Sequence, residues 1–130
     1  MIVVDASVLV TALGDDGADG RRTRTRLSGE RLVAPEVVDL EVVSAWRRLW
    51  RAGQLDNDRV EAALVDLEAI RLDRVSHLTL LRRCWELRDN LTVYDAAYVA
   101  LAERLAAILV TADGHLAEAP GSRCDIELIA

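Results

Sequence analysis

The stretch Ile2-Val3-Val4-Asp5-Ala6-Ser7 opens the chain with a short apolar run that an aspartate ends. The run is continuous and β-branched, which is typical of a strand buried on both faces. A second stretch of this kind, Ile108-Leu109-Val110-Thr111-Ala112-Asp113, lies near the other end of the chain. In an open parallel sheet, ligand sites form beyond the carboxyl ends of the strands. We therefore expect Asp5 and Asp113 at one functional edge of a sheet.

Strand-like and helix-like segments alternate between these two stretches. Helical spacing of apolar residues predicts helices that include 35–52, 59–70, 78–87 and 93–105, and further strands are expected over 32–34, 72–75 and 126–129. Segment 14–20 is rich in Gly and Asp and is predicted to be a loop. Pro35 is placed in the first turn of its helix, where its missing amide hydrogen costs nothing. The alternation predicts an α/β fold: one domain over residues 1–130, with a mainly parallel sheet of about five short strands flanked by helices.

The size and composition of the chain agree with one domain of this kind. With 130 residues and 52% hydrophobic content, the chain can bury a single core. Its longest apolar runs are too short to cross a bilayer, and no basic segment precedes an apolar one at the start, so we expect no membrane association and a cytoplasmic location. Cys84 and Cys124 have no Cys or His partner at metal-ligand spacing and are expected to be ordinary thiols.

The charge of the chain gives a mixed indication about nucleic acid. A net charge of −6 argues against general nucleic-acid binding, whose usual mark is a basic surface. Every basic residue is nevertheless an arginine, and the arginines cluster over 21–26, 47–51 and 82–88. Arginine pairs with phosphate through two parallel hydrogen bonds. Solvated helix faces account equally well for each cluster taken alone.

A glutamate on the helix over 35–52 is difficult to explain as a surface residue. Val38, Glu41, Ala45 and Leu49 fall on one apolar stripe of this helix, so Glu41 is predicted among core-facing positions. A buried carboxylate without a partner is costly, and it needs a positive charge or a metal ion nearby. Glu41 is therefore a candidate for a metal site.

Asp95 repeats this pattern on the helix over 93–105. Tyr98 and Leu105 continue its apolar stripe, although a position in the first helical turn also allows a favourable interaction with the helix dipole. Asp5 and Asp113 likewise have an alternative explanation, because an aspartate after a strand often caps the next helix.

Together, the four acids predict a metal site made of oxygen ligands. Carboxylates brought close together repel one another unless a dication neutralises them. Oxygen ligands without Cys or His favour Mg²⁺, with Mn²⁺ as an alternative. Such an ion can activate a water molecule to attack a phosphodiester. Ser7 and Thr111, each two positions from a strand-end acid, are auxiliary candidates that could orient water or phosphate, or simply form caps.

These motifs resemble those of PIN-domain ribonucleases, in particular the VapC-type toxins of type II toxin–antitoxin systems. The resemblance covers nearly the whole chain. It rests on four segments in order: Ile2-Val3-Val4-Asp5-Ala6-Ser7, Pro35-Glu36 followed by Glu41, Tyr94-Asp95-Ala96-Ala97-Tyr98-Val99-Ala100-Leu101-Ala102, and Val110-Thr111-Ala112-Asp113.

The resemblance implies an acidic catalytic site made of Asp5, Glu41, Asp95 and Asp113. Asp5 and Asp95 are implied as direct Mg²⁺ ligands, with Glu41 or Asp113 acting directly or through water. The family pattern also implies endonucleolytic cleavage of RNA (tRNA, rRNA or mRNA), a homodimer, and inhibition by a cognate antitoxin whose tail covers the site. His115 departs from the family pattern, because this stretch is often basic in relatives. The resemblance therefore does not specify the substrate contacts near Asp113.

Two other classes of function share part of this pattern. A receiver-like or phosphatase-like domain also has strand-end acids, but it commonly uses a lysine beside the phosphate, and the chain has none. A non-catalytic PIN-like module would bind RNA or a protein partner without cutting. The presence of all four acids favours the nuclease.

Overall fold

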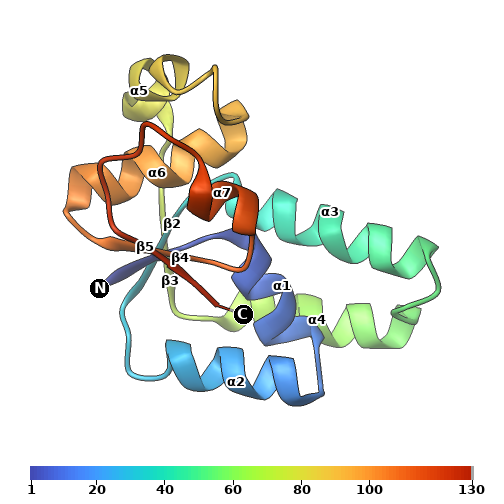
Figure 1. Cartoon of the computed structure of the whole chain (residues 1–130). Coiled ribbons are helices and arrows are strands. Elements are labelled where there is room, and N and C mark those ends of the chain that lie inside the picture. Colours follow the sequence, from blue (N-terminus) through green and yellow to red (C-terminus); the bar gives the residue numbers. More distant parts are fainter. Residues whose placement is uncertain (130) are drawn as a thin grey trace.

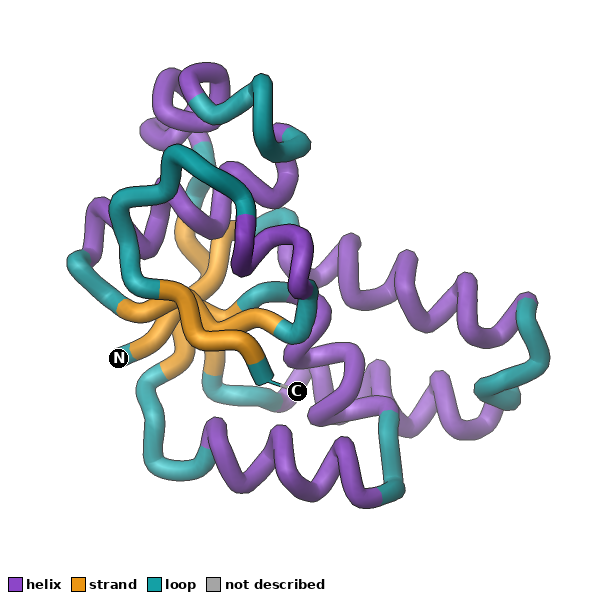
Figure 2. The backbone as a smooth tube through the Cα atoms, viewed as in Figure 1, coloured by secondary structure: helices purple, strands orange, loops and turns teal. Residues whose placement is uncertain are grey.

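The structure is a computed structural model that describes residues 1–129, and within them five strands form a single sheet (Figure 1, Figure 2). The strands are β1 (Ile2–Val4), β2 (Leu32–Pro35), β3 (Leu72–Val75), β4 (Ile108–Thr111) and β5 (Ile126–Leu128). Their order is β3-β2-β1-β4-β5, and all neighbouring pairs are parallel. The predicted α/β fold with a mainly parallel sheet is confirmed.

Helices cover both faces of the sheet, because each connection between parallel strands must cross back over it. Figure 1 shows α5 and α6 on one side of the strands and α1, α2 and α4 on the other. The helices are α1 (Ala6–Gly14), α2 (Ala18–Leu27), α3 (Val38–Arg51), α4 (Asn57–Ala69), α5 (Leu81–Glu86), α6 (Val93–Leu105) and α7 (Gly114–Glu118). Among the described residues, no helix is both long and apolar enough to cross a membrane.

The strand register brings β1 and β4, which are far apart in the sequence, side by side in the middle of the sheet. Val4 is paired with Val110, and the amide of Asp5 donates to the carbonyl of Val110 at 2.9 Å. Val3 and Val4 are fully buried, as expected for the central strand of a sheet covered on both faces. Asp5 therefore leaves β1 directly beside Thr111, the last residue of β4.

The structure places Pro35 in the sheet, and the prediction that it begins a helix is wrong. Pro35 is the last residue of β2 and is paired with Val75 of β3. A proline is tolerated here because the ladder between β2 and β1 ends at Val33, so β1 needs no amide hydrogen from it. Residues 36 and 37 form a turn, and α3 begins only at Val38.

Three other predicted boundaries also shift. Segment 78–87 is a 3-10 turn (Leu78–Leu80) followed by the short helix α5. The predicted loop over 14–20 shrinks to residues 15–17, because the Asp15 carboxylate accepts hydrogen bonds from the amides of Gly17 and Gly20 and so stabilises an early start of α2. The last strand ends at Leu128.

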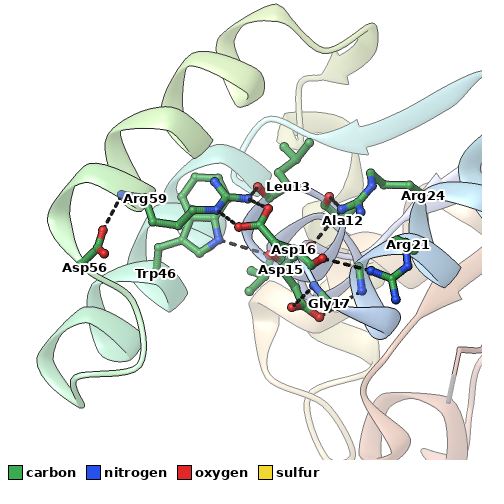
Figure 3. Close-up of polar contacts among 12 residues, drawn as sticks. Ala12, Leu13, Asp15, Asp16, Gly17, Arg21, Arg24, Trp46, Asp56 and Arg59 are labelled. Atoms are coloured by element: carbon green, nitrogen blue, oxygen red, sulfur yellow. Dashed lines mark hydrogen bonds and ion pairs between the residues drawn. The ribbon is translucent and has the colours of Figure 1, made fainter.

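Side chains from α3 and α4 fix the end of α1 in place (Figure 3). The guanidinium of Arg59 on α4 donates to both carboxylate oxygens of Asp16, at 2.9 and 3.0 Å, and to the carbonyl of Leu13 at 2.8 Å. The fully buried Trp46 of α3 donates its indole hydrogen to the carbonyl of Val10 at 3.2 Å. These bonds hold both α3 and α4 against α1, the helix that follows Asp5.

Candidate active site

The structure places all four predicted acids in the wall of one hollow of about 400 Å³. They come from four separate elements: Asp5 follows β1, Asp113 follows β4, Glu41 lies on α3 and Asp95 lies in the first turn of α6. We call this the acidic hollow. Its other lining residues are Ala6, Ser7, Val10, Thr11, Ala45, Arg48 and Ala112.

Asp5 is held by two hydroxyl groups at the floor of the acidic hollow, where only 5% of the residue is exposed. Ser7 donates to its Oδ2 atom at 2.5 Å, and Thr111 donates to the same oxygen at 2.9 Å. Both hydroxyl oxygens already accept a backbone hydrogen, Ser7 from Ala112 and Thr111 from Asp113, each at 3.0 Å. Each hydroxyl hydrogen is therefore directed at Asp5, and Oδ1 receives neither of them.

Helix capping explains Asp113 but not Asp5. Asp5 stands at the N-cap position of α1, yet its side chain makes no capping hydrogen bond there. The side chain of Asp113 caps α7 by accepting from the amide of His115 at 2.9 Å. Thr92 caps α6 by accepting from the amide of Asp95 at 3.1 Å. The capping of α6 by Thr92 leaves the Asp95 carboxylate free to face the hollow.

Glu41 lies at the flank of the apolar stripe on α3, so the prediction that it faces the core is only partly right. The buried residues of this helix are Val38, Val42 and Trp46, and Glu41 is half-buried beside them. Its Oε1 atom accepts a 2.6 Å hydrogen bond from the hydroxyl of Tyr98, which is fully buried on α6. The carboxylate thus has one oxygen satisfied by the core while the side chain lines the acidic hollow.

Burial raises the pKa values of three of these acids, and neighbouring negative charges add to the rise for two of them. Burial raises the pKa of Asp5, and its bonds from Ser7 and Thr111 offset part of this rise. Burial also raises the pKa of Asp95, and the charges of Asp5 and Asp113 raise it further. The pKa of Glu41 is raised by burial first and then by the charges of Asp5 and Asp95. A cation in the acidic hollow would favour the charged form of all three.

The donor atoms of the acidic hollow suit a hard divalent cation. Its ionisable ligands are carboxylates, and no Cys or His is found among the described residues that line it. Within residues 1–129, no three such side chains stand close enough to enclose an ion by themselves. Mg²⁺ commonly keeps several waters and uses only one or two carboxylates together with substrate phosphate. The separated carboxylates fit this open form of coordination.

Comparison with known proteins identifies the family to which this arrangement belongs. The model of the PIN domain family matches residues 2–122. The chain belongs to the PIN-domain family. It is also 40% identical to ribonuclease VapC9 of Mycobacterium tuberculosis over 129 residues, which cover 99% of this chain and 98% of that protein. Ribonuclease VapC1 of the same organism is 40% identical over 128 residues, covering 98% of this chain and 96% of the relative.

The resemblance to VapC-type PIN-domain ribonucleases is thereby confirmed over nearly the full length of the chain. Ribonuclease VapC3 of Mycobacterium tuberculosis is a further relative, 40% identical over 118 residues, which cover 91% of this chain and 86% of that protein. In each comparison the two chains match over most of their length. The PIN domain is therefore related to these ribonucleases as a whole and not through one shared segment.

Two residues of this PIN domain matter to the site more than their sequence pattern indicated. The sequence indicates Tyr98 only as part of an apolar stripe, whereas in the structure its hydroxyl donates to Glu41. Arg48 was one member of an arginine cluster, whereas it lines the acidic hollow. Helical spacing offered a signal for Arg48, because it lies seven residues after Glu41 and hence on the same side of α3. His115 is exposed and is not among the lining residues.

Proposed function

We propose that this chain is a metal-dependent endoribonuclease that cleaves RNA in the acidic hollow and acts as the toxin of a toxin–antitoxin pair. The observation that carries the proposal is the convergence of four carboxylates, from four separate elements, on one hollow. The likeness to VapC ribonucleases supports RNA as the substrate. Residues 1–130 are proposed to form one nuclease domain.

Asp5, Asp95 and Asp113 are proposed to hold the metal ion. Oxygen donors favour Mg²⁺, with Mn²⁺ as the alternative. When bound, Mg²⁺ would lower the pKa of a water molecule and neutralise charge that develops on the phosphate. The chain itself supplies a carboxylate that is already oriented, because Ser7 and Thr111 fix one oxygen of Asp5 before any ligand arrives.

Glu41 is proposed to orient the water molecule that attacks the phosphodiester. The hydroxyl of Tyr98 occupies one lone pair of Oε1, which fixes the orientation of the carboxylate. The remaining acceptor positions of the carboxylate are available to hydrogens of a water molecule. A carboxylate with a raised pKa also accepts a proton more readily than an ordinary one.

The partners of the protein are proposed from its family. We infer a homodimer, a cognate antitoxin whose tail covers the acidic hollow, and a tRNA, rRNA or mRNA target in the cytoplasm. The likeness to VapC ribonucleases along nearly the whole chain supports these partners.

RNA cleavage by purified variants tests the catalytic part of the proposal. Wild-type protein in Mg²⁺ should cut RNA, and EDTA should stop it. Asp5→Asn and Asp95→Asn should each abolish cleavage while circular dichroism shows an unchanged fold. Glu61→Gln is the matched control, because Glu61 is an exposed acid on α4 outside the hollow. Cleavage by Asp5→Asn at the wild-type rate would refute the assignment.

Expression in bacteria tests the toxin part. Wild-type chain expressed alone should arrest growth, and Asp5→Asn should not. Sequencing of RNA ends after brief expression would identify the target and the position of the cut. A reading frame for a small DNA-binding protein directly upstream would identify the antitoxin, and its co-expression should restore growth. Normal growth of cells that accumulate active wild-type chain would contradict toxicity.

A further inference from the structure

One basic side chain belongs to the wall of the acidic hollow. Arg48 is the single positively charged residue among the described residues that line it. It lies on α3 two turns after Glu41, and Ala45 lies between them on the same side of the helix. The side of α3 that lines the hollow thus changes in charge, from negative at Glu41 to positive at Arg48.

Arg48 also borders a second hollow next to the first. This neighbouring hollow has a volume of about 500 Å³, and Glu41 and Arg48 line both. Its other lining residues are Val37, Leu40, Ser44 and Tyr94. A nucleic-acid strand that passes from one hollow into the other would therefore run beside the guanidinium of Arg48.

The guanidinium of Arg48 has most of its hydrogen-bonding capacity free. Its Nη1 atom donates to the hydroxyl of Ser44 at 3.2 Å, and within residues 1–129 no carboxylate lies at ion-pair distance. Arg59 and Arg83, in contrast, are each committed to an acid. A guanidinium carries five hydrogens in a planar fork that matches two phosphate oxygens.

The negative charge of the molecule explains why a free guanidinium beside the acidic hollow would help RNA to bind. The chain carries a net charge of −6, and four of its carboxylates are concentrated in the acidic hollow, where an anionic strand must approach. A local positive charge at the rim offsets this repulsion for one phosphate. A phosphate on Arg48 would also fix how far the strand slides into the hollow.

We propose that Arg48 binds an RNA phosphate that flanks the phosphodiester to be cleaved, and so positions the strand across the two hollows. The inference rests on the proposed function, because it assumes RNA as the ligand. It adds a phosphate-binding residue to the acids of the site.

Binding of RNA to a cleavage-inactive protein tests the role of Arg48 without requiring catalysis. In an Asp5→Asn background, fluorescence anisotropy would measure binding of a fluorescein-labelled single-stranded RNA of mixed sequence. Adding Arg48→Gln should raise the Kd roughly tenfold or more, as expected for loss of a charged hydrogen bond. The salt dependence, as the slope of log K against log salt, should become shallower by about 0.7.

Arg47→Gln is the matched control for the binding experiment. Arg47 precedes Arg48 on α3, carries the same charge and is exposed, but it lines a different surface with Trp50 and Arg51. It should therefore change the Kd much less than Arg48→Gln. Equal weakening by both variants would mean that only net charge matters, and unchanged binding by Arg48→Gln would mean no phosphate contact; either result overturns the proposal. Thermal melting verifies that both exposed-residue variants fold.

Cleavage of modified RNA locates the phosphate in the active enzyme. Each linkage of a cleaved oligonucleotide is replaced in turn by a neutral 2′-O-methyl methylphosphonate, with a 2′-O-methyl phosphodiester at the same position as control. One replacement beside the cut should lower the kcat/KM of the wild type to that of Arg48→Gln, and it should have no further effect on Arg48→Gln itself. Independent effects of the replacement and the substitution would overturn the proposal. If wild-type protein cuts no RNA, the proposed function fails, and the binding comparison still decides the role of Arg48.

Discussion

The hydroxyl of Tyr98 donates a 2.6 Å hydrogen bond to Oε1 of Glu41, although 57 positions separate the two residues in the sequence. The contact joins α6 to α3 at the border between the core and the acidic hollow. Burial raises the pKa of Tyr98, and the bond to Glu41 raises it further, so the hydroxyl keeps its hydrogen over the whole working pH range. Tyr98 is therefore a permanent donor to a carboxylate that belongs to the site.

Tyr98→Phe should reduce cleavage while the fold persists. The phenylalanine ring fills the same space, but Glu41 loses its orienting donor. We expect a loss of about 1 kcal/mol in the free energy of unfolding, the usual value of one hydrogen bond. The kcat should fall about tenfold, which corresponds to ~1.4 kcal/mol in the barrier. Urea denaturation and single-turnover cleavage measure the two effects.

Tyr94→Phe is the control for that experiment, because Tyr94 is exposed on the same helix and no hydrogen bond joins it to Glu41. It should have little effect on the free energy of unfolding. A wild-type kcat for Tyr98→Phe would show that the orientation of Glu41 does not limit the reaction.

Asp5→Asn should raise the melting temperature of the metal-free protein at neutral pH. Burial raises the folded-state pKa of Asp5 above the ordinary value of 3.8, so the charged form destabilises the fold. Between the ordinary pKa of the unfolded state and the raised pKa of the folded state, the folded protein binds more protons than the unfolded protein. Stability therefore falls as the pH rises from the lower of these two pKa values to the higher one. Asparagine stays neutral and avoids this loss.

The pH dependence distinguishes this effect from a simple change in packing. In EDTA, the advantage of Asp5→Asn should be fully present at pH 7.5 and should shrink as the pH approaches 3.8, where wild-type Asp5 is protonated as well. Melting curves at several pH values would record the difference. A variant that melts below the wild type at neutral pH would contradict the prediction.

Mg²⁺ should stabilise the wild-type protein at neutral pH, because it binds only where the fold brings the acids together. At a concentration 100 times its Kd, the gain is about 2.7 kcal/mol. Asp95→Asn should lower this gain, whereas Glu61→Gln on α4 should retain it. Melting temperature against Mg²⁺ concentration is the measurement. Equal gains in all three proteins would place the ion elsewhere.

Gly14→Ala should destabilise the protein through Trp46. A Cβ atom at this position would lie 2.7 Å from the indole nitrogen of Trp46, which is fully buried and cannot move aside freely. We expect a loss of ~1–3 kcal/mol, typical of an overpacked core. Gly114→Ala is the control, because nothing lies within 4 Å of its added Cβ. Urea midpoints that do not differ between the two variants would contradict this account.

Local sequence patterns were sufficient to predict the central strand and the acids that follow it. The β-branched run before Asp5 needs no knowledge of distant residues to be recognised, and the same holds for the run before Asp113. Pro35 was misplaced because proline suits both the first turn of a helix and the end of a strand. The choice depends on where the ladder to β1 stops, which is a property of the assembled sheet.

The contacts around the acids could not be predicted from local patterns. An apolar stripe indicates that Tyr98 is buried, but the partner of its hydroxyl depends on how α6 packs against α3. Ser7 and Thr111 were recognised as auxiliary polar residues, yet their common target, one oxygen of Asp5, follows only from the parallel pairing of β1 with β4.

The pairing of β1 with β4 also determines when a growing chain can become active. Asp5 is made first, but its donor Thr111 lies 106 positions later, and Asp113 follows two residues after that. A polypeptide still attached to the ribosome with β4 unfinished lacks the central ladder, one hydroxyl donor and one acid. The nascent chain therefore cannot cleave RNA beside the translating ribosome until β4 and Asp113 have been synthesised and paired with β1.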